Sequence, residues 1–260
     1  MLRCLYTAAT GMEAQQTRMD VISNNLANAS TTGFKKVRAE FEDLLSDTLR
    51  AGGQAGPLGG APAPLQVGLG VRNASTSRTL GQGDLATTNN PLDLAVQGNG
   101  FFRIQQVNGD LAYTRAGNFR IDSTGRIVTQ GGDVVDPGIT VPPDATAIAV
   151  AADGTVTATL AGRTEAQQLG QIQLFTFTNP AGLTAVGGNL LAPSAASGDA
   201  VQARPGEQGA GTLAQGVLEG SNAKAVEEMI DMIACQRAYE LNSKTVTTAD
   251  QMLQRLTNIR

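Results

Sequence analysis

The two ends of this 260-residue chain constrain its fold most, because each carries a long helical pattern with an apolar stripe. In the first, leucine and methionine recur at heptad spacing, at Leu5, Met12, Met19 and Leu26. A heptad stripe of this kind is typical of a helix that packs against another helix. The pattern ends in the polar stretch 28–33, Asn-Ala-Ser-Thr-Thr-Gly, so the sequence predicts a helix over residues 2–27.

A second helical pattern covers residues 223–257 and contains no proline or glycine. Ser221 or Asn222 can cap its first turn. Its apolar residues recur at the spacing of one helix face, and those expected to lie between helices are Ile233, Leu241, Met252 and Leu256. One helix pair buries only a few layers of apolar side chains. Fixing the backbone of each residue costs about 1–2 kcal/mol of conformational entropy, which so few layers offset only in part. We therefore expect the two helices to pack side by side and to become firmly ordered only among neighbouring copies.

The middle of the chain has a different pattern, in which glycine and proline recur and β-branched residues alternate with polar ones. Asn108-Gly109 and Asp153-Gly154 are strong hairpin signals. Strands do not alternate with helices here, so the pattern indicates a meander or Greek-key-like β-domain. The short strands expected are 101–104, 119–121, 126–128, 147–150, 155–157 and 172–177.

Together these patterns predict an α+β fold. The N- and C-terminal helices form a coiled-coil-like core domain, and the central domain is β-rich. Glycine and proline are concentrated between residues 51 and 64, which is typical of a linker or an extended arm. The predicted parts are the N-terminal helix of the core domain (1–33), the arm (34–66), the β-rich body (67–220) and the C-terminal helix of the core domain (221–260).

The composition argues against an enzyme, a metal site and a nucleic-acid-binding protein. The chain has no histidine, which removes the commonest general base and the commonest metal ligand. Its net charge is −4 without a basic run, whereas nucleic-acid binding needs a positive patch. Cys4 and Cys235 form neither a metal motif nor a disulfide framework, and we interpret both as small apolar helix residues. We expect no catalytic residue, no cofactor and no metal.

No apolar run is long enough to cross a membrane, and the N-terminus lacks the apolar core of a cleaved secretory signal. We therefore expect no membrane insertion, and either a cytoplasmic protein or export with an uncut N-terminus. The alternative from another class is a secreted β-rich enzyme or a carbohydrate-binding module. Such a protein needs a concave site with convergent polar groups, and no motif indicates one.

Several motifs, spread in order over nearly the whole chain, resemble those of the bacterial flagellar rod and hook axial family. They are NNLAN (24–28), TTGFK (31–35), GNGFF (98–102), YTRAGNF (113–119), QRAYELNSK (236–244) and DQML (250–253). Within this family the chain is most similar to the distal rod type. The features that point there are its length, FEDLL at 41–45 with the arm that follows, and QGDL at 82–85.

The resemblance implies a structural subunit of the bacterial flagellar distal rod, which self-assembles into a helical tubular drive shaft and transmits torque from motor to hook. Its implied partners are copies of itself, other flagellar rod proteins, the hook protein, basal-body ring proteins and the flagellar type III export apparatus. The implied location is the periplasm-spanning rod of the basal body, after export from the cytoplasm without signal cleavage. A proximal rod or hook subunit of the same family is the nearest alternative.

The predicted site is a self-assembly interface with an apolar and a polar part. The apolar part consists of the helix residues Leu5, Met12, Met19, Leu26, Ile233, Leu241, Met252 and Leu256. Where a helix meets the arm or the body, the candidates for polar junction contacts are Asn24, Asn25, Asn28 and Asn222. The alternative for the apolar part is ordinary packing within one subunit, since one helix pair can bury part of a stripe.

Overall fold

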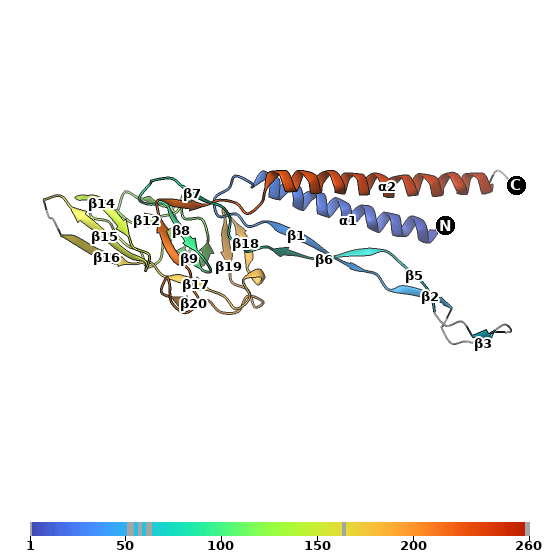
Figure 1. Ribbon diagram of the computed structural model, residues 1–260, viewed down its shortest axis with the longest axis horizontal. Coiled ribbons are helices and arrows are strands. Elements are labelled where there is room, and N and C mark those ends of the chain that lie inside the picture. The colour runs from blue at the N-terminus through green and yellow to red at the C-terminus, as the bar shows by residue number, and fades with distance from the viewer. Residues whose placement is uncertain (1, 51–54, 57–58, 61–63, 163–164, 258–260) are drawn as a thin grey trace. The chain divides into compact units, whose positions relative to one another are not determined.

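The chain divides into two compact units, whose elements are labelled in Figure 1. The computed structural model describes residues 2–50, 55–56, 59–60, 64–162 and 165–257. The helical unit comprises Met1–Ala27, Val37–Ser77 and Ala225–Arg260, and the strand unit comprises Asn28–Lys36 and Arg78–Lys224. Both ends of the chain are helical and the central region is rich in strands, which confirms the predicted α+β class.

The helical unit contains two long helices, α1 (Leu2–Ala27) and α2 (Ala225–Thr257), which pack against each other. α1 has the predicted bounds, because no proline interrupts its pattern before the polar stretch that follows. α2 begins at Ala225, slightly later than predicted, and Ser221 Oγ accepts a hydrogen bond from Ala223 N (3.1 Å) ahead of it. Within the described residues, neither helix is long and apolar enough to cross a membrane.

The helical unit also contains paired strands. β1 (Val37–Asp43) pairs with β6 (Val71–Arg78), β2 (Ser46–Arg50) pairs with β5 (Leu65–Gly68), and β3 (Ala55–Gly56) pairs with β4 (Gly59–Gly60). Much of the predicted arm 34–66 is therefore paired β-structure where the structure describes it. Its stretches 51–54, 57–58 and 61–63 lie outside the described residues.

The strand unit is built around a nine-stranded sheet with the order β11-β12-β13-β9-β10-β19-β18, in which β17 pairs with β9 and β20 pairs with β17. The strands of this sheet are β9 (Phe101–Gln105), β10 (Leu111–Thr114), β11 (Arg120–Ile121), β12 (Ile127–Val128), β13 (Val134–Val135), β17 (Leu174–Thr176), β18 (Thr184–Gly187), β19 (Leu190–Ala192) and β20 (Val201–Ala203). A short 3-10 helix, η1 (Pro180–Gly182), precedes β18.

Smaller sheets complete the strand unit. β14 (Ala145–Val150), β15 (Thr155–Leu160) and β16 (Ala166–Gln171) form an antiparallel meander. β7 (Leu85–Thr87) pairs with β22 (Val217–Glu219), and β8 (Leu94–Gln97) pairs with β21 (Thr212–Gln215). Each of the six predicted strand stretches overlaps an observed strand.

Both predicted hairpin turns are present. Asn108-Gly109 lies between β9 and β10, and Asp153-Gly154 lies between β14 and β15. Gly109 has φ +90° and Gly154 has φ +84°, a conformation that glycine adopts without a steric penalty. These local signals were sufficient to place the two turns.

The strand unit has a hydrophobic core of its own. Phe102, Ile104 and Leu174 are fully buried at its centre, and the rings of Phe102 and Phe119 meet edge to face at 5.1 Å. Burying side chains of this size contributes roughly 1.5–3 kcal/mol each. A second, smaller cluster consists of Phe101, Tyr113, Phe175, Phe177, Leu183 and Leu191.

Candidate assembly surface and a buried charge cluster

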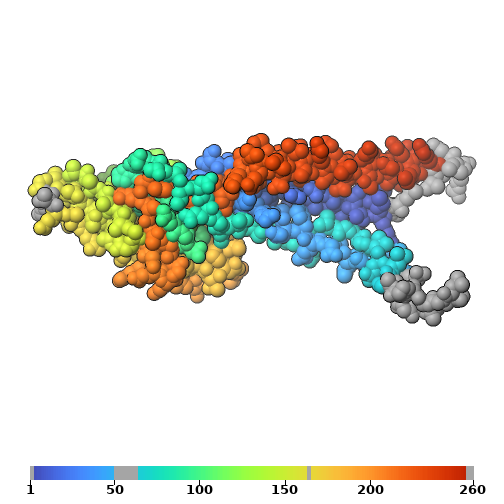
Figure 2. All heavy atoms as spheres, in the orientation of Figure 1, coloured from blue at the N-terminus to red at the C-terminus, as the bar shows by residue number. Residues whose placement is uncertain are grey.

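α2 exposes large apolar side chains along one face. We call the residues of this face the α2 stripe; they are Val226, Ile230, Ile233, Leu241 and Met252. Leu241 is 66 % exposed and Ile233 is 53 % exposed, although both are strongly hydrophobic. In Figure 2 the atoms of α2 are red, and much of the side of α2 that faces the viewer is exposed. Three of the predicted interface residues, Ile233, Leu241 and Met252, thus lie together on an exposed surface of the subunit.

The contacts between α1 and α2 are small and polar by comparison. The thiol of Cys235 is buried and donates to Gln15 O (3.0 Å). A Cβ added at Gly11 would lie 2.9 Å from Asn242 Nδ2, so the two helices approach closely at this glycine. α2 therefore packs on α1 mainly through a face other than its stripe. Cys4, in contrast, lies in α1 as expected but is exposed.

The heptad residues of α1 are intermediate in exposure. Leu5, Met12, Met19 and Leu26 are each half-buried, whereas Ala8, Ala14 and Ile22 are the buried apolar residues of the helix. The single helix pair thus leaves part of this stripe uncovered. Leu256 lies in α2, but its side chain is outside the described part of the structure.

An apolar groove of about 400 Å³ extends the exposed surface of the helical unit. It is lined by Cys4 of α1 and by Leu241, Thr245, Ala249 and Met252 of α2. The groove thus brings two residues of the α2 stripe next to the beginning of α1. A hollow with this lining can receive an apolar side chain from another helix.

Asn25 forms the clearest polar junction in the helical unit. It is 2 % exposed, and its Nδ2 donates to Val37 O (2.8 Å) and to Glu228 Oε2 (3.1 Å). Its Oδ1 accepts from Val37 N (2.9 Å). One side chain therefore joins the end of α1 to the beginning of β1 and to α2 within the subunit.

The other predicted asparagines have different surroundings. Asn222 Oδ1 accepts from Lys36 N (2.7 Å), and Asn222 Nδ2 donates to Thr79 O (2.8 Å), all within the strand unit. Asn28 Oδ1 accepts from Thr31 Oγ (3.2 Å) in the turn that follows α1. Asn24 is exposed on α1. The structure therefore places Asn25 and Asn222 at separate junctions, one in each unit.

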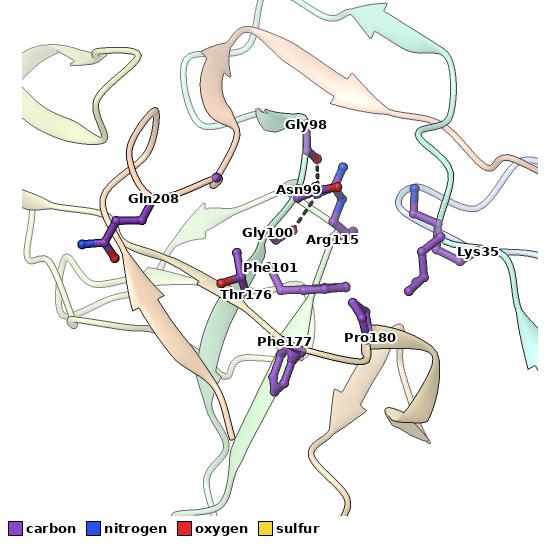
Figure 3. A pocket seen from close by; sticks show the side chains of 12 residues that line it. Lys35, Gly98, Asn99, Gly100, Phe101, Arg115, Thr176, Phe177, Pro180 and Gln208 are labelled. Carbon is purple, nitrogen blue, oxygen red and sulfur yellow. Dashed lines mark hydrogen bonds between the residues drawn. The ribbon is translucent and has the colours of Figure 1, made fainter. Parts of the chain in front are cut away.

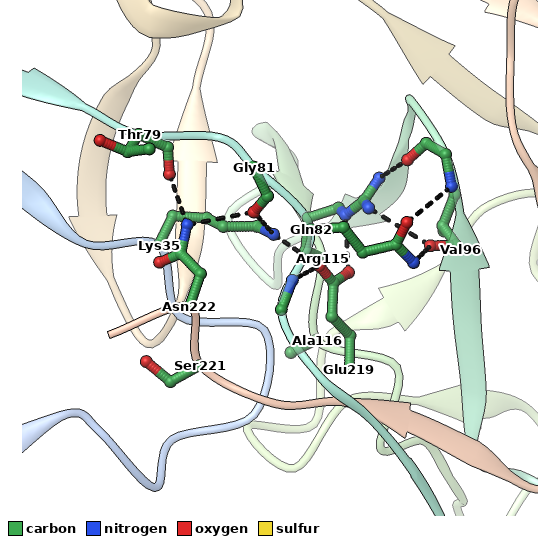
Figure 4. A network of polar contacts seen from close by, with 12 residues as sticks. Lys35, Thr79, Gly81, Gln82, Val96, Arg115, Ala116, Glu219, Ser221 and Asn222 are labelled. Carbon is green, nitrogen blue, oxygen red and sulfur yellow. Dashed lines mark hydrogen bonds and ion pairs between the residues drawn. The ribbon is translucent and has the colours of Figure 1, made fainter. Parts of the chain in front are cut away.

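A buried charge cluster in the strand unit was not predicted from the sequence. Glu219 is fully buried and accepts from Lys35 Nζ (2.5 Å), Arg115 Nε (2.9 Å) and Gly83 N (3.0 Å), as Figure 4 illustrates. Lys35 is 3 % exposed and Arg115 is 6 % exposed. Two cations thus share one carboxylate where water is excluded.

Lys35 and Arg115 also donate hydrogen bonds to backbone carbonyl oxygens of other segments. Arg115 donates to the carbonyl oxygens of Gly98 (2.8 Å) and Gly100 (2.6 Å), and Lys35 donates to Gly81 O (2.8 Å). Lys35 belongs to the TTGFK motif and Arg115 to the YTRAGNF motif. The motifs were visible in the sequence, but their partner Glu219 had no signal of its own, because it is 184 positions from Lys35.

Burial and charge act in opposite directions on this cluster. Burial alone would raise the pKa of the Glu219 carboxyl, but the charge of Arg115 and the hydrogen bond from Lys35 hold that pKa below its ordinary value. Burial lowers the pKa of Lys35, and the nearby Glu219 opposes this effect. Glu219 is therefore ionised at neutral pH and neutralises one of its two cationic neighbours.

Comparisons with known proteins agree with the terminal and central motifs. The family model for flagella basal body rod proteins matches residues 5–35, the model for the FlgE/F/G D1 domain of flagellar hook proteins matches 95–158, and the model for the C-terminal region of flagellar basal body rod FlgEFG proteins matches 214–259. The flagellar basal-body rod protein FlgG of Caulobacter vibrioides is 50 % identical over 261 residues, covering 100 % of both chains.

More distant relatives distinguish the branches of the family. FlgG of Bacillus subtilis is 42 % identical over 266 residues and also covers 100 % of both chains. The flagellar hook protein FlgE of Helicobacter mustelae is 44 % identical over 138 residues, which are 52 % of this chain and 30 % of that protein. The chain belongs to the family of flagellar basal-body rod proteins. It is a structural subunit of the flagellar rod, of the predicted distal type, and not an enzyme.

Proposed function

We propose that the subunit assembles head to tail with copies of itself into a helical tube, and that the α2 stripe provides the main apolar contact. The observation that supports this most strongly is the exposure of Leu241 (66 %) and Ile233 (53 %) on a helix that already packs on α1 through another face. A repeated self-contact without closed symmetry produces an open helical polymer. Large apolar side chains exposed along one helix face in this way are typical of an interaction site.

In this assembly, α1 and α2 of neighbouring copies form a coiled-coil-like core. The half-buried residues Leu5, Met12, Met19 and Leu26 of α1 become covered there, together with the α2 stripe. Leu256 joins this core at the end of α2. The polar candidates Asn24, Asn25, Asn28 and Asn222 hold the helices to the adjoining segments, so that load on a helix passes to the rest of the subunit.

The family supports a wider setting for this tube. We propose that it is the part of the basal body that spans the periplasm and transmits torque from motor to hook. Its neighbours are other rod proteins, the hook protein and the basal-body ring proteins, and the flagellar type III apparatus exports the subunit. In the assembled rod, segments 1–33 and 221–260 form the core domain, 34–66 the arm and 67–220 the outer body.

Replacing Leu241 by Asp tests the role of the α2 stripe. Because Leu241 is mostly exposed in the subunit, the change alters the free energy of unfolding by no more than about 0.5 kcal/mol. In the polymer, it removes an apolar contact of roughly 1.5–3 kcal/mol and buries a charge in every subunit. We expect filaments to disappear from electron micrographs and only single subunits to sediment.

Gln236→Asp is the matched control, since it places the same charge on an exposed polar position of the same helix. This variant is expected to assemble. Circular dichroism spectra of both variants check that the subunit stays folded. If Leu241→Asp and Ile233→Asp both assemble as well as the unmodified chain, the α2 stripe is not the assembly contact.

A further inference from the structure

A cavity of about 340 Å³ lies in the strand unit (Figure 3), and none of its lining residues belongs to the helices that carry the proposed assembly contact. Its apolar wall is formed by the rings of Phe101 and Phe177, whose centroids are 5.9 Å apart, and by Leu80 and Pro180. This volume falls in the range of pockets that hold small ligands, roughly 300–1,000 Å³. The hollow therefore has room for a compact apolar group.

Two buried cations also line this cavity. They are Lys35 and Arg115 of the charge cluster, and among the described residues Glu219 is the one carboxylate that pairs with them. Since a single carboxylate neutralises only one of two cations, the cavity borders a buried excess of one positive charge. A positive charge beside low-dielectric walls attracts anions more strongly than the same charge does in water.

The hydrogen-bond capacity of these two side chains is not fully used within the described part of the chain. A lysine ammonium group has three N–H donors and an arginine guanidinium group has five. Lys35 donates to Gly81 O and Glu219 Oε1. Arg115 donates to Glu219 Oε2 and to the carbonyl oxygens of Gly98, Gly100 and Val96. By this count each cation retains one N–H for a further acceptor.

The Gly98-Asn99-Gly100 turn also lines the cavity, but it does not act as a phosphate loop. Its Gly98 and Gly100 carbonyl oxygens face Arg115 and accept from it, so they add partial negative charge there. The positive character of the site thus comes from the Lys35 and Arg115 side chains. Single positive excess fits one carboxylate better than a multiply charged phosphate.

We propose that this cavity binds a carboxylate carried on a short apolar stem. The stem packs on Phe101, Phe177, Leu80 and Pro180, and the carboxylate lies toward Lys35 and Arg115. The carboxylate supplies the charge that Glu219 leaves unbalanced and accepts the remaining N–H groups. The ligand is either a free small carboxylate or the acidic group of a neighbouring copy; the two have the same chemistry.

Binding is measured by calorimetry on the full chain carrying Leu241→Asp, so that the result does not depend on assembly. The probes are 3-phenylpropionate and its neutral amide, 3-phenylpropanamide, which share the aromatic stem. We expect the acid to bind about tenfold more tightly, because hydrogen bonds between charged groups are the stronger ones. Equal affinities for acid and amide, or no binding of the acid, would overturn the proposal.

Thr176 offers a matched pair of variants at the cavity. It lines the hollow, is half-buried, and its hydroxyl makes only a long hydrogen bond to Val201 O (3.4 Å). Thr176→Asp places a negative charge beside the ligand, whereas Thr176→Asn has nearly the same shape without charge. We expect Thr176→Asp to weaken acid binding by about tenfold or more and Thr176→Asn to retain it. Equal binding by the two variants would exclude a charge-based site.

The same titration on the assembled, unmodified protein distinguishes the two sources of the ligand. If the acid still binds, the ligand is a free small carboxylate. If single subunits bind the acid and the polymer does not, an acidic group of a neighbouring copy occupies the cavity. Failure of the subunits to assemble would refute the proposed function and leave the binding result on single subunits intact.

Discussion

Replacing Glu219 by Gln is expected to destabilise the strand unit strongly. The glutamine has nearly the same shape but no negative charge, and its amide NH₂ must face a cation. The variant thus leaves Lys35 and Arg115, which are 3 % and 6 % exposed, without a counter-ion. Leaving a buried charge unpaired costs about 3–5 kcal/mol in other proteins.

The hydrogen bonds of Glu219 give a similar value for the loss of stability. Its carboxylate makes two hydrogen bonds with cations, at 2.5 and 2.9 Å, and one with Gly83 N at 3.0 Å. Hydrogen bonds to charged groups contribute roughly 1.5–3 kcal/mol each, so losing the two ionic ones costs about 3–6 kcal/mol. At roughly 2–4 °C per kcal/mol for a domain of this size, the melting temperature of the strand unit should fall by about 10 °C.

Asp136→Asn is the control, because it removes one carboxylate charge from the same unit. Asp136 pairs with Arg103 at 2.7 Å, but the two side chains are 27 % and 24 % exposed. Arg103 also keeps its stacking on the Phe175 ring, 4.2 Å away. Pairs this accessible contribute about 0–1 kcal/mol. Near-ultraviolet circular dichroism follows the melting through the buried Tyr113; equal losses in the two variants would refute the argument from burial.

Acid gives an independent test of Glu219. Its pKa is lower in the folded state than in the unfolded chain, so the unfolded chain takes up its proton first as the pH falls. The stabilisation by Glu219 is complete above the unfolded pKa, near about 4.3, and is lost as the pH falls through the folded pKa. The acid-induced loss of stability should therefore be smaller in Glu219→Gln than in the unmodified protein, relative to each protein's own value at neutral pH.

Two further substitutions and one titration test local features of the structure. Asn25→Ala removes both hydrogen bonds to the Val37 backbone and should cost the helical unit about 1–3 kcal/mol in urea unfolding; no measurable change would contradict the junction role. Carboxyl NMR should find the pKa of Asp122 at about 2, lowered by the Thr124 side chain and by backbone N–H groups, and an ordinary value would contradict this hydrogen bonding. Gly117→Ala should destabilise the strand unit by about 1–3 kcal/mol or more, because its Cβ would overlap the Leu94 carbonyl oxygen, and a neutral effect would contradict the close approach.

Local features of the fold could be predicted because short stretches of sequence determine them. The bounds of α1 follow from its apolar period and from the polar stretch after Ala27. The two hairpin turns follow from Asn108-Gly109 and Asp153-Gly154, since glycine alone readily takes the positive φ that each turn requires. β16, with the sequence AQQLGQ, has no comparable signal, because glutamine and glycine have little preference for strands. This segment is a strand because it pairs with β15.

The charge cluster could not be predicted, because its members are far apart in the sequence. Glu219 is separated from Lys35 by 184 positions and from Arg115 by 104. Lysine, arginine and glutamate usually lie on protein surfaces, so none of the three residues, taken alone, indicates a buried position. Glu219 lies on β22, Lys35 in the segment 28–36 and Arg115 directly after β10, so only the tertiary fold brings them together.

The orientation of α2 is the most informative difference between pattern and structure. The apolar period of α2 identifies a stripe, but it cannot tell whether the stripe faces α1 or another molecule. In the structure, α1 contacts a face that contains Cys235 and Asn242, and Gly11 allows the close approach. Leu241 and Ile233 remain exposed because α1 packs on this other face of α2, where the contacts are small and polar.

This orientation separates the residues that fold the subunit from those of the proposed assembly contact. The strand unit buries its large apolar residues, such as Phe102 and Leu174, within its own core. The helical unit leaves several large apolar residues of α2 on the surface, and the apolar residues buried in α1 are Ala8, Ala14 and Ile22. Substitutions in the α2 stripe should therefore affect assembly with little effect on folding, and substitutions in the strand core should do the reverse. If one stripe served both purposes, folding of the subunit would already bury the apolar residues that the proposed assembly contact needs.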